Sequence, residues 1–438
     1  MSNAYNDQST LVGNFKERYA DSIQALYSFM SPLCKEYFPF QAAKAIGNLY
    51  HQPADLQMEA GISHSAGGTT PQASGLTGFI SPIPGQMQDA QAVGGQIFGR
   101  AQVAYEAQYR SKGGEKAFVE SVGWIVKRLS LAHMKRMEIF ALHGGRGLGT
   151  IDSNAAAVSL TRAYTLTTAT SSPGVWNGLL GSRIVFWKSD YSALDSLAGN
   201  GVITASVSGM TFDASTYQVV VTLTYNTSSG NTDLTTDFTG DQVFFETGGP
   251  GNEMNGIDGW AQVSSTSSSW FNIAPGTYDL WRGNQIAVGG SLRFANIVQG
   301  CALAQNYGIL SGPLLCVVSP LIFSNVMTEQ AALRRYGAEK VDNEFQNGAK
   351  KLVFNTGAGE VELMGHPMQK VGLAHICCPE EGKRIGASDI TFITRGGGGE
   401  QLILESATAP ASEMRSYSLT ELFFEQPRHN VVLTGITG

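Results

Sequence analysis

Four glycines, Gly144, Gly145, Gly147 and Gly149, stand close together in the stretch ALHGGRGLGT, and glycine-rich loops of this kind often bind phosphate. Such a loop follows a strand and opens a helix, because the positive N-terminal end of the helix then faces the anion. Here the glycines follow a long helical pattern, at its negative end, and no Gly-Lys-Ser/Thr comes after them. The run therefore predicts a helix C-cap at Gly144 and Gly145 followed by a turn, and not a nucleotide site.

A soft-metal site is the second candidate, because His375, Cys377 and Cys378 lie close together in AHICCPEE. Zinc needs ligands that converge on a tetrahedron, normally as two spaced pairs. Adjacent cysteines cannot easily do this, and the sequence has no second pair. A buried strand that ends at Pro379 is the favoured interpretation.

Hydrolytic chemistry has no better support. The sequence contains no Gly-x-Ser-x-Gly elbow, and its seven histidines form no His-Glu-x-x-His set. Ser319, before a proline and an apolar run, is better explained as a helix cap. His133 falls near the apolar face of a long helix and is expected to be packed and hydrogen-bonded. An enzyme is therefore the least supported class, and we expect no cofactor or metal.

The length, composition and net charge of the chain limit the class of protein it can be. The chain has 438 residues, 42% of them hydrophobic and 15% charged, enough for two or three units with a real core. Its formal net charge of -7 argues against general affinity for nucleic-acid backbones. No signal peptide or membrane-spanning stretch is expected, and five scattered cysteines favour a reducing compartment without disulfides.

The elements that would position any site begin with a helix over residues 115–143, whose apolar residues recur at helical spacing. Lys127, Arg128 and Lys135 lie on its polar side, with Glu120 and Glu138 among them. A nucleic-acid patch would be less mixed in sign, so this pattern favours a face that contacts solvent or another subunit.

The segment before this helix has an unusual composition. Between Glu59 and Asp89 there is no charged residue, although the segment is rich in Gly, Ser, Thr, Pro and Gln. The alternation in QIFGRAQVAYEAQY, residues 96–109, is typical of a strand. Together they predict a long β-ribbon that cannot bury itself within its own chain and needs a partner.

After the helix, residues 155–250 contain short runs of alternating hydrophobicity separated by turn residues. They predict a compact all-β insertion, a small barrel or sandwich. Residues 251–400 then alternate helix and strand, with one helix opened by Ser319 and Pro320, and strands close the chain at 401–438.

This order of parts resembles the major capsid protein of tailed bacteriophages, a fold shared with encapsulins. The segment from FGRAQVAYEAQYRSKGGEKAFVESVGWIV through ALHGGRGLGTID is similar to the family's extended loop, spine helix and Gly-Arg-Gly turn. The stretches NEMNGIDGWAQV, YDLWRGN and SPLIFSNVM resemble the return into its axial domain. EMRSYSLTELFFEQPRHNVVL resembles the last strands of its peripheral domain.

The resemblance implies an α+β fold in six parts. These are an N-terminal arm (1–49), an extended β-ribbon loop (50–112), a peripheral domain with the spine helix (113–154), the all-β insertion (155–250), an axial domain (251–400) and return strands to the peripheral domain (401–438).

The same resemblance implies a structural protein that assembles as hexamers and pentamers into an icosahedral shell. The shell would enclose double-stranded DNA without sequence-specific contact, in a virion assembled in the bacterial cytoplasm. A separate scaffolding protein, a portal and a cement protein are the implied partners, with no membrane. The residues expected at subunit interfaces are Phe79, Ile80, Arg100, Val103 and Tyr105. The cations expected to face the interior, toward DNA or a neighbouring loop, are Lys127, Arg128 and Lys135.

Two alternatives stay open on sequence alone. An encapsulin-like compartment would share the fold, although encapsulins usually lack so large an insertion. A β-rich carbohydrate-binding or tail-associated module would use Trp176, Trp187, Trp260 and Trp270 on one exposed face.

Overall fold

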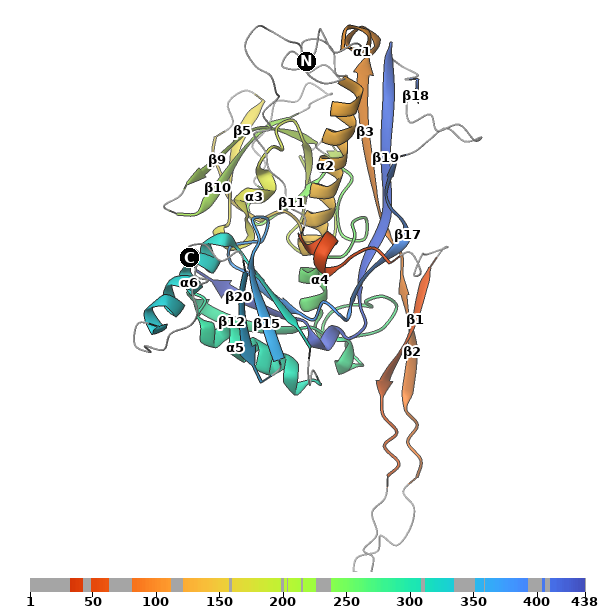
Figure 1. Cartoon of the computed structure of the whole chain (residues 1–438), viewed down its shortest axis with the longest axis vertical. Coiled ribbons are helices and arrows are strands. Elements are labelled where there is room, and N and C mark those ends of the chain that lie inside the picture. The colour runs from red at the N-terminus through yellow and green to blue at the C-terminus, as the bar shows by residue number, and fades with distance from the viewer. Residues whose placement is uncertain are drawn as a thin grey trace, which may run out of the picture.

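A computed structural model gives the architecture. It describes residues 32–41, 49–62, 81–111, 121–156, 160–197, 201–202, 204–213, 216–225, 238–308, 312–334, 351–357, 359–392, 404–405 and 410–437. Figure 1 shows an elongated body from which a two-stranded ribbon projects at one end. Helices and strands are mixed in the described residues, so the α+β class is confirmed. None of the described helices is long and apolar enough to span a membrane.

A long helix and a sheet run side by side through the upper half of the body (Figure 1). The helix is α2 (Ser121–His143), and the sheet consists of β3 (Gly95–Ala104), β17 (Gly382–Phe392), β18 (Leu404–Glu405) and β19 (Ala411–Phe424). β19 pairs antiparallel with β3 from Ala411↔Ala104 to Thr420↔Gly95, and with β17 and β18 on its other edge. Helix α2 is described from Ser121 onward, and the expected start at residue 115 lies outside the described residues.

The expected strand over residues 96–109 is partly wrong. β3 ends at Ala104, and α1 (Tyr105–Ser111) follows directly. The expectation that this stretch has no partner within its own chain is also wrong, since β3 is hydrogen-bonded to β19 over its whole length. The alternation was read correctly for β3, but its partner lies some 300 residues later in the sequence.

The projecting ribbon consists of β1 (Tyr50–Gln57) and β2 (Gln86–Ala92), which pair antiparallel only with each other among the described residues. Its root is fixed to the body. Gln91 N donates to Phe271 O at 3.0 Å, and the ring centroids of Tyr50 and Phe423 lie 5.7 Å apart. The ribbon is therefore a rooted element with a defined direction.

A mixed six-stranded sheet forms the lower half of the body, in the order β12-β20-β16-β13-β15-β14. Its strands are β12 (Asn284–Gly290), β13 (Leu314–Val318), β14 (Lys351–Thr356), β15 (Gly359–Gly365), β16 (Ala374–Cys377) and β20 (Val431–Ile436). Two helices, α5 (Phe294–Asn306) and α6 (Pro320–Arg334), pack against one face of this sheet. The cap expected at Ser319 is confirmed, because its Oγ accepts a hydrogen bond from Ile322 N at 3.4 Å.

β13 is apolar throughout because both of its faces are buried. Leu314, Cys316 and Val318 belong to the core shared with α5 and α6, whereas Leu315 and Val317 belong to the central core on the other face. A strand covered on both faces has no polar side, so the run PLLCVV reads as continuously hydrophobic.

The predicted all-β insertion is a six-stranded antiparallel sheet in the order β11-β6-β9-β10-β5-β4. Its strands are β4 (Ile151–Asn154), β5 (Thr161–Leu166), β6 (Arg183–Trp187), β9 (Ala205–Asp213), β10 (Gln218–Tyr225) and β11 (Gln242–Phe245), with α3 (Pro173–Trp176) after β5. The two ends of the sheet meet: Leu148 N donates to Val243 O at 2.7 Å, and Val243 N donates to Gly149 O at 2.9 Å. The sheet therefore closes into a small barrel, called the insertion barrel below. A separate two-stranded hairpin joins β7 (Ser196–Leu197) to β8 (Gly201–Val202).

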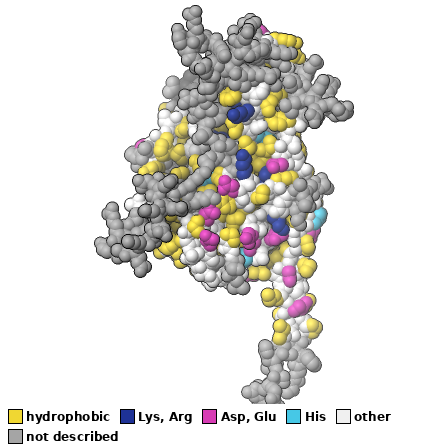
Figure 2. All heavy atoms as spheres, in the orientation of Figure 1, with side chains coloured by type: hydrophobic (Ala, Val, Ile, Leu, Met, Phe, Trp, Pro, Cys, Tyr) yellow, Lys and Arg dark blue, Asp and Glu magenta, His cyan; other side chains and the backbone are white. Residues whose placement is uncertain are grey.

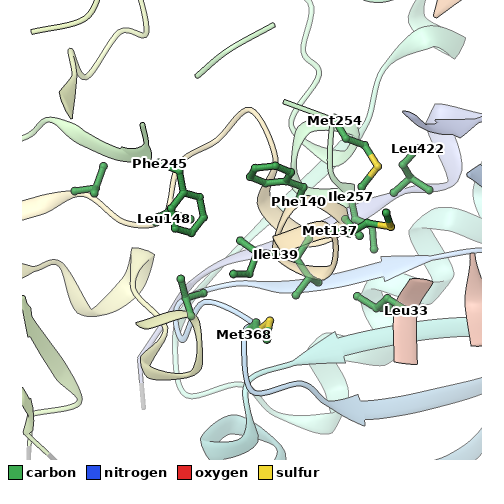
Figure 3. Packing of buried hydrophobic residues seen from close by; sticks show 14 of the residues in the cluster. Leu33, Met137, Ile139, Phe140, Leu148, Phe245, Met254, Ile257, Met368 and Leu422 are labelled. Carbon is green, nitrogen blue, oxygen red and sulfur yellow. The ribbon is translucent and has the colours of Figure 1, made fainter. Parts of the chain in front are cut away.

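The parts meet at the C-terminal end of α2. Figure 3 shows Met137 and Phe140 of α2 among Phe245 of the barrel, Met254 and Met368. The short elements at this junction and around it are η2 (Leu33–Tyr37), η4 (Thr168–Thr170), α4 (Ile257–Ala261), η5 (Asp279–Trp281) and η6 (Pro427–His429). One continuous hydrophobic cluster therefore joins the helix, the barrel and the lower sheet.

The glycine run is the turn that the sequence predicts. α2 ends at His143, Gly144 N donates to Phe140 O at 2.9 Å, and Gly145 has the left-handed φ of 75° expected of a C-cap glycine. A Cβ on Gly144 would lie 1.8 Å from the carbonyl oxygen of Met254, so only glycine fits there. The run lets the chain leave the helix in close contact with the segment before α4.

Candidate assembly surfaces

The outer face of the ribbon is exposed and both apolar and acidic. Residues directly opposite in an antiparallel pair share a face, so the pairs Asp55↔Met87 and Pro53↔Asp89 place these four side chains together. Met87 is 68% exposed and Met58, just beyond β1, is 86% exposed. The opposite face carries the buried side chains Leu56, Ala90 and Ala92, which belong to the central hydrophobic cluster of the body.

Charge on the ribbon has one sign. Asp55, Glu59 and Asp89 are its acidic residues, and the sequence has no Lys or Arg between residues 45 and 99. Asp89 contacts the ring of His51 across the ribbon, whereas Asp55 and Glu59 are exposed. Other large apolar side chains exposed at the far end are Ile62 and Ile83.

The five residues expected at subunit interfaces are placed differently. Phe79 and Ile80 lie outside the described residues. Val103 is fully buried within the subunit, which leaves no side-chain surface for a neighbour. Arg100, with a side chain 59% exposed, forms an ion pair with Glu413 at 2.6 Å, and Tyr105 begins α1.

A groove runs between α2 and the insertion barrel and encloses about 420 Å³. Ile125, Leu129 and Ile139 of α2 form part of its wall, with Leu179 of the barrel and Met368. A second hollow of about 400 Å³ continues it toward β3 and shares Leu129, Ala132 and Arg136 with the first. We call the two together the helix–barrel groove.

Cations from a single helix line this groove. Arg128, Lys135 and Arg136 are seven and eight residues apart along α2 and point into it. Figure 2 shows Lys and Arg side chains among hydrophobic ones on the face over this helix. Among the described residues no carboxylate forms an ion pair with any of the three, but Glu246 and Glu253 line the second hollow, where Arg136 also lies.

The pKa values of two of these cations are lowered by their surroundings. Burial, and then the charge of Arg136, lower the pKa of Lys135 to about 8, and burial lowers that of Arg136 to about 10. Lys135 Nζ donates to the backbone oxygen of Asn177 in the barrel, and the guanidinium of Arg136 lies 3.1 Å from the centre of the Phe245 ring. The charge of Glu253, a buried carboxylate that lines the second hollow, raises the pKa of Arg136 and partly offsets the effect of burial.

Of the cations expected to face the interior, the structure brings Arg128 and Lys135 together in the groove, and Lys127 lies outside it, 5.9 Å from the Trp124 ring. Arg136 was not singled out from the sequence. Its spacing from Arg128 and Leu129 along one helix is the signal that would have found it. The sign of charge along this helix is less mixed than expected on the side that faces the groove.

Glu138 corrects the expectation for the polar side of α2. It is fully buried, and its carboxylate accepts hydrogen bonds from Leu33 N at 2.9 Å, Cys34 N at 3.1 Å and His366 Nε2 at 3.1 Å. It ties the helix to η2 and to the segment after β15. The sequence gives no sign of this because all three partners are distant in the chain.

A second buried network lies beside it. Asp258 of α4 accepts a hydrogen bond from His375 Nε2 at 3.1 Å and lies 3.8 Å from Lys370 Nζ and 3.7 Å from His143 Nδ1. Burial alone would raise the pKa of Asp258, but the hydrogen bond from His375, the nearby ring of His143 and the charge of Lys370 hold it well below its usual range. Burial, and then Lys370, lower the pKa of His143 to about 3. These groups join α2, α4 and β16 and form no open site.

The segment with His375, Cys377 and Cys378 contains the buried strand β16 that the sequence predicts. His375 donates from Nε2 to Asp258, and its Nδ1 receives a hydrogen bond from Gln369 Nε2 at 3.0 Å. Cys377 ends β16, and all five cysteines are buried as free thiols. His133, as expected, is packed and bonded, with Ser416 Oγ at 2.9 Å and Ser418 Oγ at 2.7 Å. Burial lowers the pKa of His133 to about 4.

The tryptophans do not form an exposed binding face. Trp176 and Trp260 are 2% and 0% exposed, and Trp270 packs edge-on against Trp260 with ring centroids 5.7 Å apart. Trp187 lies on the barrel, with its ring against Gly249. The arrangement required by a carbohydrate-binding module is therefore absent from these four positions.

No family model and no curated protein matches the chain. Among solved structures, the capsid asymmetric unit of cyanophage A-1(L) matches 97% of this chain and 97% of that chain, with a TM-score of 0.57 and 9% identity. The Mycobacterium phage Adephagia structure covers 98% of each chain with a TM-score of 0.43 and 11% identity. The capsid of the native GTA particle covers 96% of this chain and 95% of that chain, with a TM-score of 0.45 and 6% identity. The first of these shows that the chain shares a phage capsid fold over nearly its whole length, which confirms the resemblance at the level of the fold.

Proposed function

We propose that this chain, which folds like a phage capsid subunit, is a major capsid protein that assembles as hexamers and pentamers into an icosahedral shell. The observation that carries the proposal is the ribbon. It is rooted in the body, projects beyond it and exposes Met58 and Met87, although it has no core of its own (Figure 1). A two-stranded ribbon is marginal by itself in water, so such an element is expected to be covered by a partner.

Assembly from many modest contacts fits this construction. A contact between two different surfaces of the same chain is head-to-tail, and it closes into a ring when the rotation allows. Each subunit in a shell touches several neighbours, so weak contacts add to a stable whole. The ribbon carries few charges, so covering it desolvates little.

The wider setting is part of the same proposal. The shell would enclose double-stranded DNA without sequence-specific contact, consistent with a formal net charge of -7. A scaffolding protein, a portal and a cement protein would be the partners, and assembly would take place in the bacterial cytoplasm before the virion is released. Lys127, which lies outside the helix–barrel groove, is our candidate for a cation that faces the interior.

The test is assembly with and without the ribbon tip. The full chain, purified alone or with a co-expressed scaffolding protein, is expected to give capsomer rings or shells by negative-stain electron microscopy. Replacing residues 58–85 by Asn-Gly joins the paired residues Gln57 and Gln86 through a tight turn. This variant should keep the circular dichroism and melting temperature of the parent and form no shells.

A full chain that stays monomeric with scaffold present would contradict the proposal and favour a binding module. Shells of normal size and yield from the ribbon variant would show that the ribbon is not what holds the subunits together.

A further inference from the structure

We propose that Asn177 is a site of spontaneous deamidation, which converts its neutral amide into a carboxylate beside Lys135 in the helix–barrel groove. The chemistry belongs to the folded subunit by itself and does not depend on assembly. Asn-Gly pairs are the least hindered sites for this reaction, because glycine has no side chain to keep its nitrogen away from the Asn amide. The sequence has four such pairs, at residues 177–178, 200–201, 255–256 and 347–348. The structure describes both residues of the pairs 177–178 and 255–256.

Deamidation needs only water as a co-reactant. The Gly178 nitrogen attacks Cγ of Asn177 and gives up its proton, while the Cγ–Nδ2 bond breaks and ammonia leaves. The attack is intramolecular and closes a five-membered succinimide ring. Water then opens the ring at either carbonyl, which leaves aspartate or isoaspartate at position 177. One water is consumed, one ammonia is released, and the chain gains one negative charge.

Asn177 and Gly178 form an open type II turn after α3. Both residues are exposed, and Leu179 N donates to Trp176 O across the turn at 3.1 Å. Among the described residues nothing accepts a hydrogen bond from the Gly178 nitrogen, so this nucleophile is free. Ring closure requires rotation about the Cα–C bond of Asn177 from its ψ of 121°. The turn has room for this, since a Cβ placed on Gly178 would meet no atom within 4 Å.

The pair Asn255–Gly256 has the same two residues in a fixed environment. Gly256 N donates to Gly144 O at 3.2 Å, and Asn255 Nδ2 donates to Glu421 Oε1 at 3.0 Å. A Cβ on the buried Gly256 would lie 2.6 Å from the backbone of Leu142. Nucleophile, amide and backbone are all held, so we expect Asn255 to keep its amide.

The new carboxylate changes the charge of the groove where it has cations alone. Among the described residues that line the hollow between α2 and the insertion barrel there is no carboxylate, whereas Glu246 and Glu253 line the second hollow. Lys135 Nζ donates to the backbone oxygen of Asn177, so a carboxylate on that residue lies beside the ammonium group. Burial lowers the pKa of Lys135 to about 8, and a neighbouring negative charge raises it again.

Peptide mapping of the aged protein tests the site. The purified full chain is incubated at mildly alkaline pH, digested, and analysed by liquid chromatography and mass spectrometry for aspartate and isoaspartate. In the folded chain the converted fraction at Asn177 should be at least ten times that at Asn255. In the chain unfolded by urea the two should convert at similar rates, because only the fold distinguishes them. Equal conversion in the folded chain, or an intact Asn177 where the unfolded chain converts, would overturn the proposal.

A lysine-labelling experiment tests the effect on charge. Asn177→Asp supplies the product directly, and Asn177→Ser is the uncharged control. Brief acetylation near pH 8 labels lysines in their neutral form, so the labelling of Lys135 should fall at least threefold in Asn177→Asp and stay at the parent level in Asn177→Ser. Lys127, outside the groove, should be labelled equally in all three proteins. Unchanged labelling of Lys135 in Asn177→Asp would show that the carboxylate does not act on this cation.

Discussion

Glu421 is a buried carboxyl group whose protonation should make the stability of the subunit depend on pH. It lies on β19 with 1% of its surface exposed, and its Oε1 accepts hydrogen bonds from the backbone N and the Nδ2 of Asn255, each at 3.0 Å. No cation offsets its burial in this contact. Burial raises the pKa of Glu421 from 4.5 to about 8, so the folded chain holds this proton at neutral pH.

The direction in which the stability changes with pH follows from the raised pKa of Glu421. Below pH 4.5 both the folded and the unfolded chain carry the proton, and the stability is fully present. Between pH 4.5 and about 8 only the unfolded chain releases it, so the free energy of unfolding falls as pH rises. At about 1.4 kcal/mol for each pH unit, the loss is on the order of 4 to 5 kcal/mol at most.

Glu421→Gln isolates this effect, because glutamine keeps the acceptor oxygen and does not titrate. We expect the variant to match the parent within about 1 kcal/mol near pH 5 and to exceed it by several kcal/mol at pH 8.5. The measurement is urea unfolding followed by tryptophan fluorescence, since Trp260 donates from its ring to the carbonyl of the adjacent Leu422 at 2.8 Å.

Glu413→Gln is the opposite-sign control. Although burial would raise it, hydrogen bonds from Arg100, Gln102 and Arg415 hold the pKa of Glu413 at about 2. Its contribution is present above the ordinary carboxyl range and lost as pH falls toward 2. Replacing it should therefore destabilise the neutral protein and flatten the acid limb. Parallel pH profiles for the parent and Glu421→Gln would refute the assignment of a buried, protonated carboxyl.

Two further predictions concern the packing around the end of α2. Gly144→Ala would place a Cβ 1.8 Å from the carbonyl oxygen of Met254 and should cost several kcal/mol, whereas Gly123→Ala, with nothing within 4 Å, should stabilise α2 by up to about 1 kcal/mol. Thermal melts of the two variants test this, and equal melting temperatures would contradict it. Trp260→Phe leaves the Leu422 carbonyl without its buried donor and should cost about 1 to 3 kcal/mol in urea unfolding. A change below 0.5 kcal/mol would mean that this bond contributes nothing net.

Patterns with local causes were predictable from the sequence. In β10, Val219, Val221 and Leu223 are buried between half-buried neighbours, most of them polar, as the alternation indicates. The cap at Ser319 and the left-handed glycine after α2 follow from the chemistry of those residues alone. Such features depend on a few neighbouring residues, which a sequence displays directly.

Features that depend on distant partners were not predictable. Residues 95–104 have the alternation of a ribbon strand, and only the pairing with β19 places them inside the body. Glu138 has the spacing of an exposed helical residue, and only η2 and His366 make it a buried acceptor. The groove was missed for the same reason, since its second wall comes from the barrel.

The distribution of charge explains how one chain can have a stable interior and a surface that binds other molecules. At the junction of α2, α4 and β16, Asp258 is paired with several bases in its own subunit, so separating these elements would leave a buried charge uncompensated. In the helix–barrel groove, buried Glu253 raises the pKa of Arg136 through its charge, and among the described residues neither Arg128 nor Lys135 forms an ion pair with a carboxylate. A charge paired within the subunit stabilises the subunit, whereas a charge left for a neighbour stabilises only the assembly.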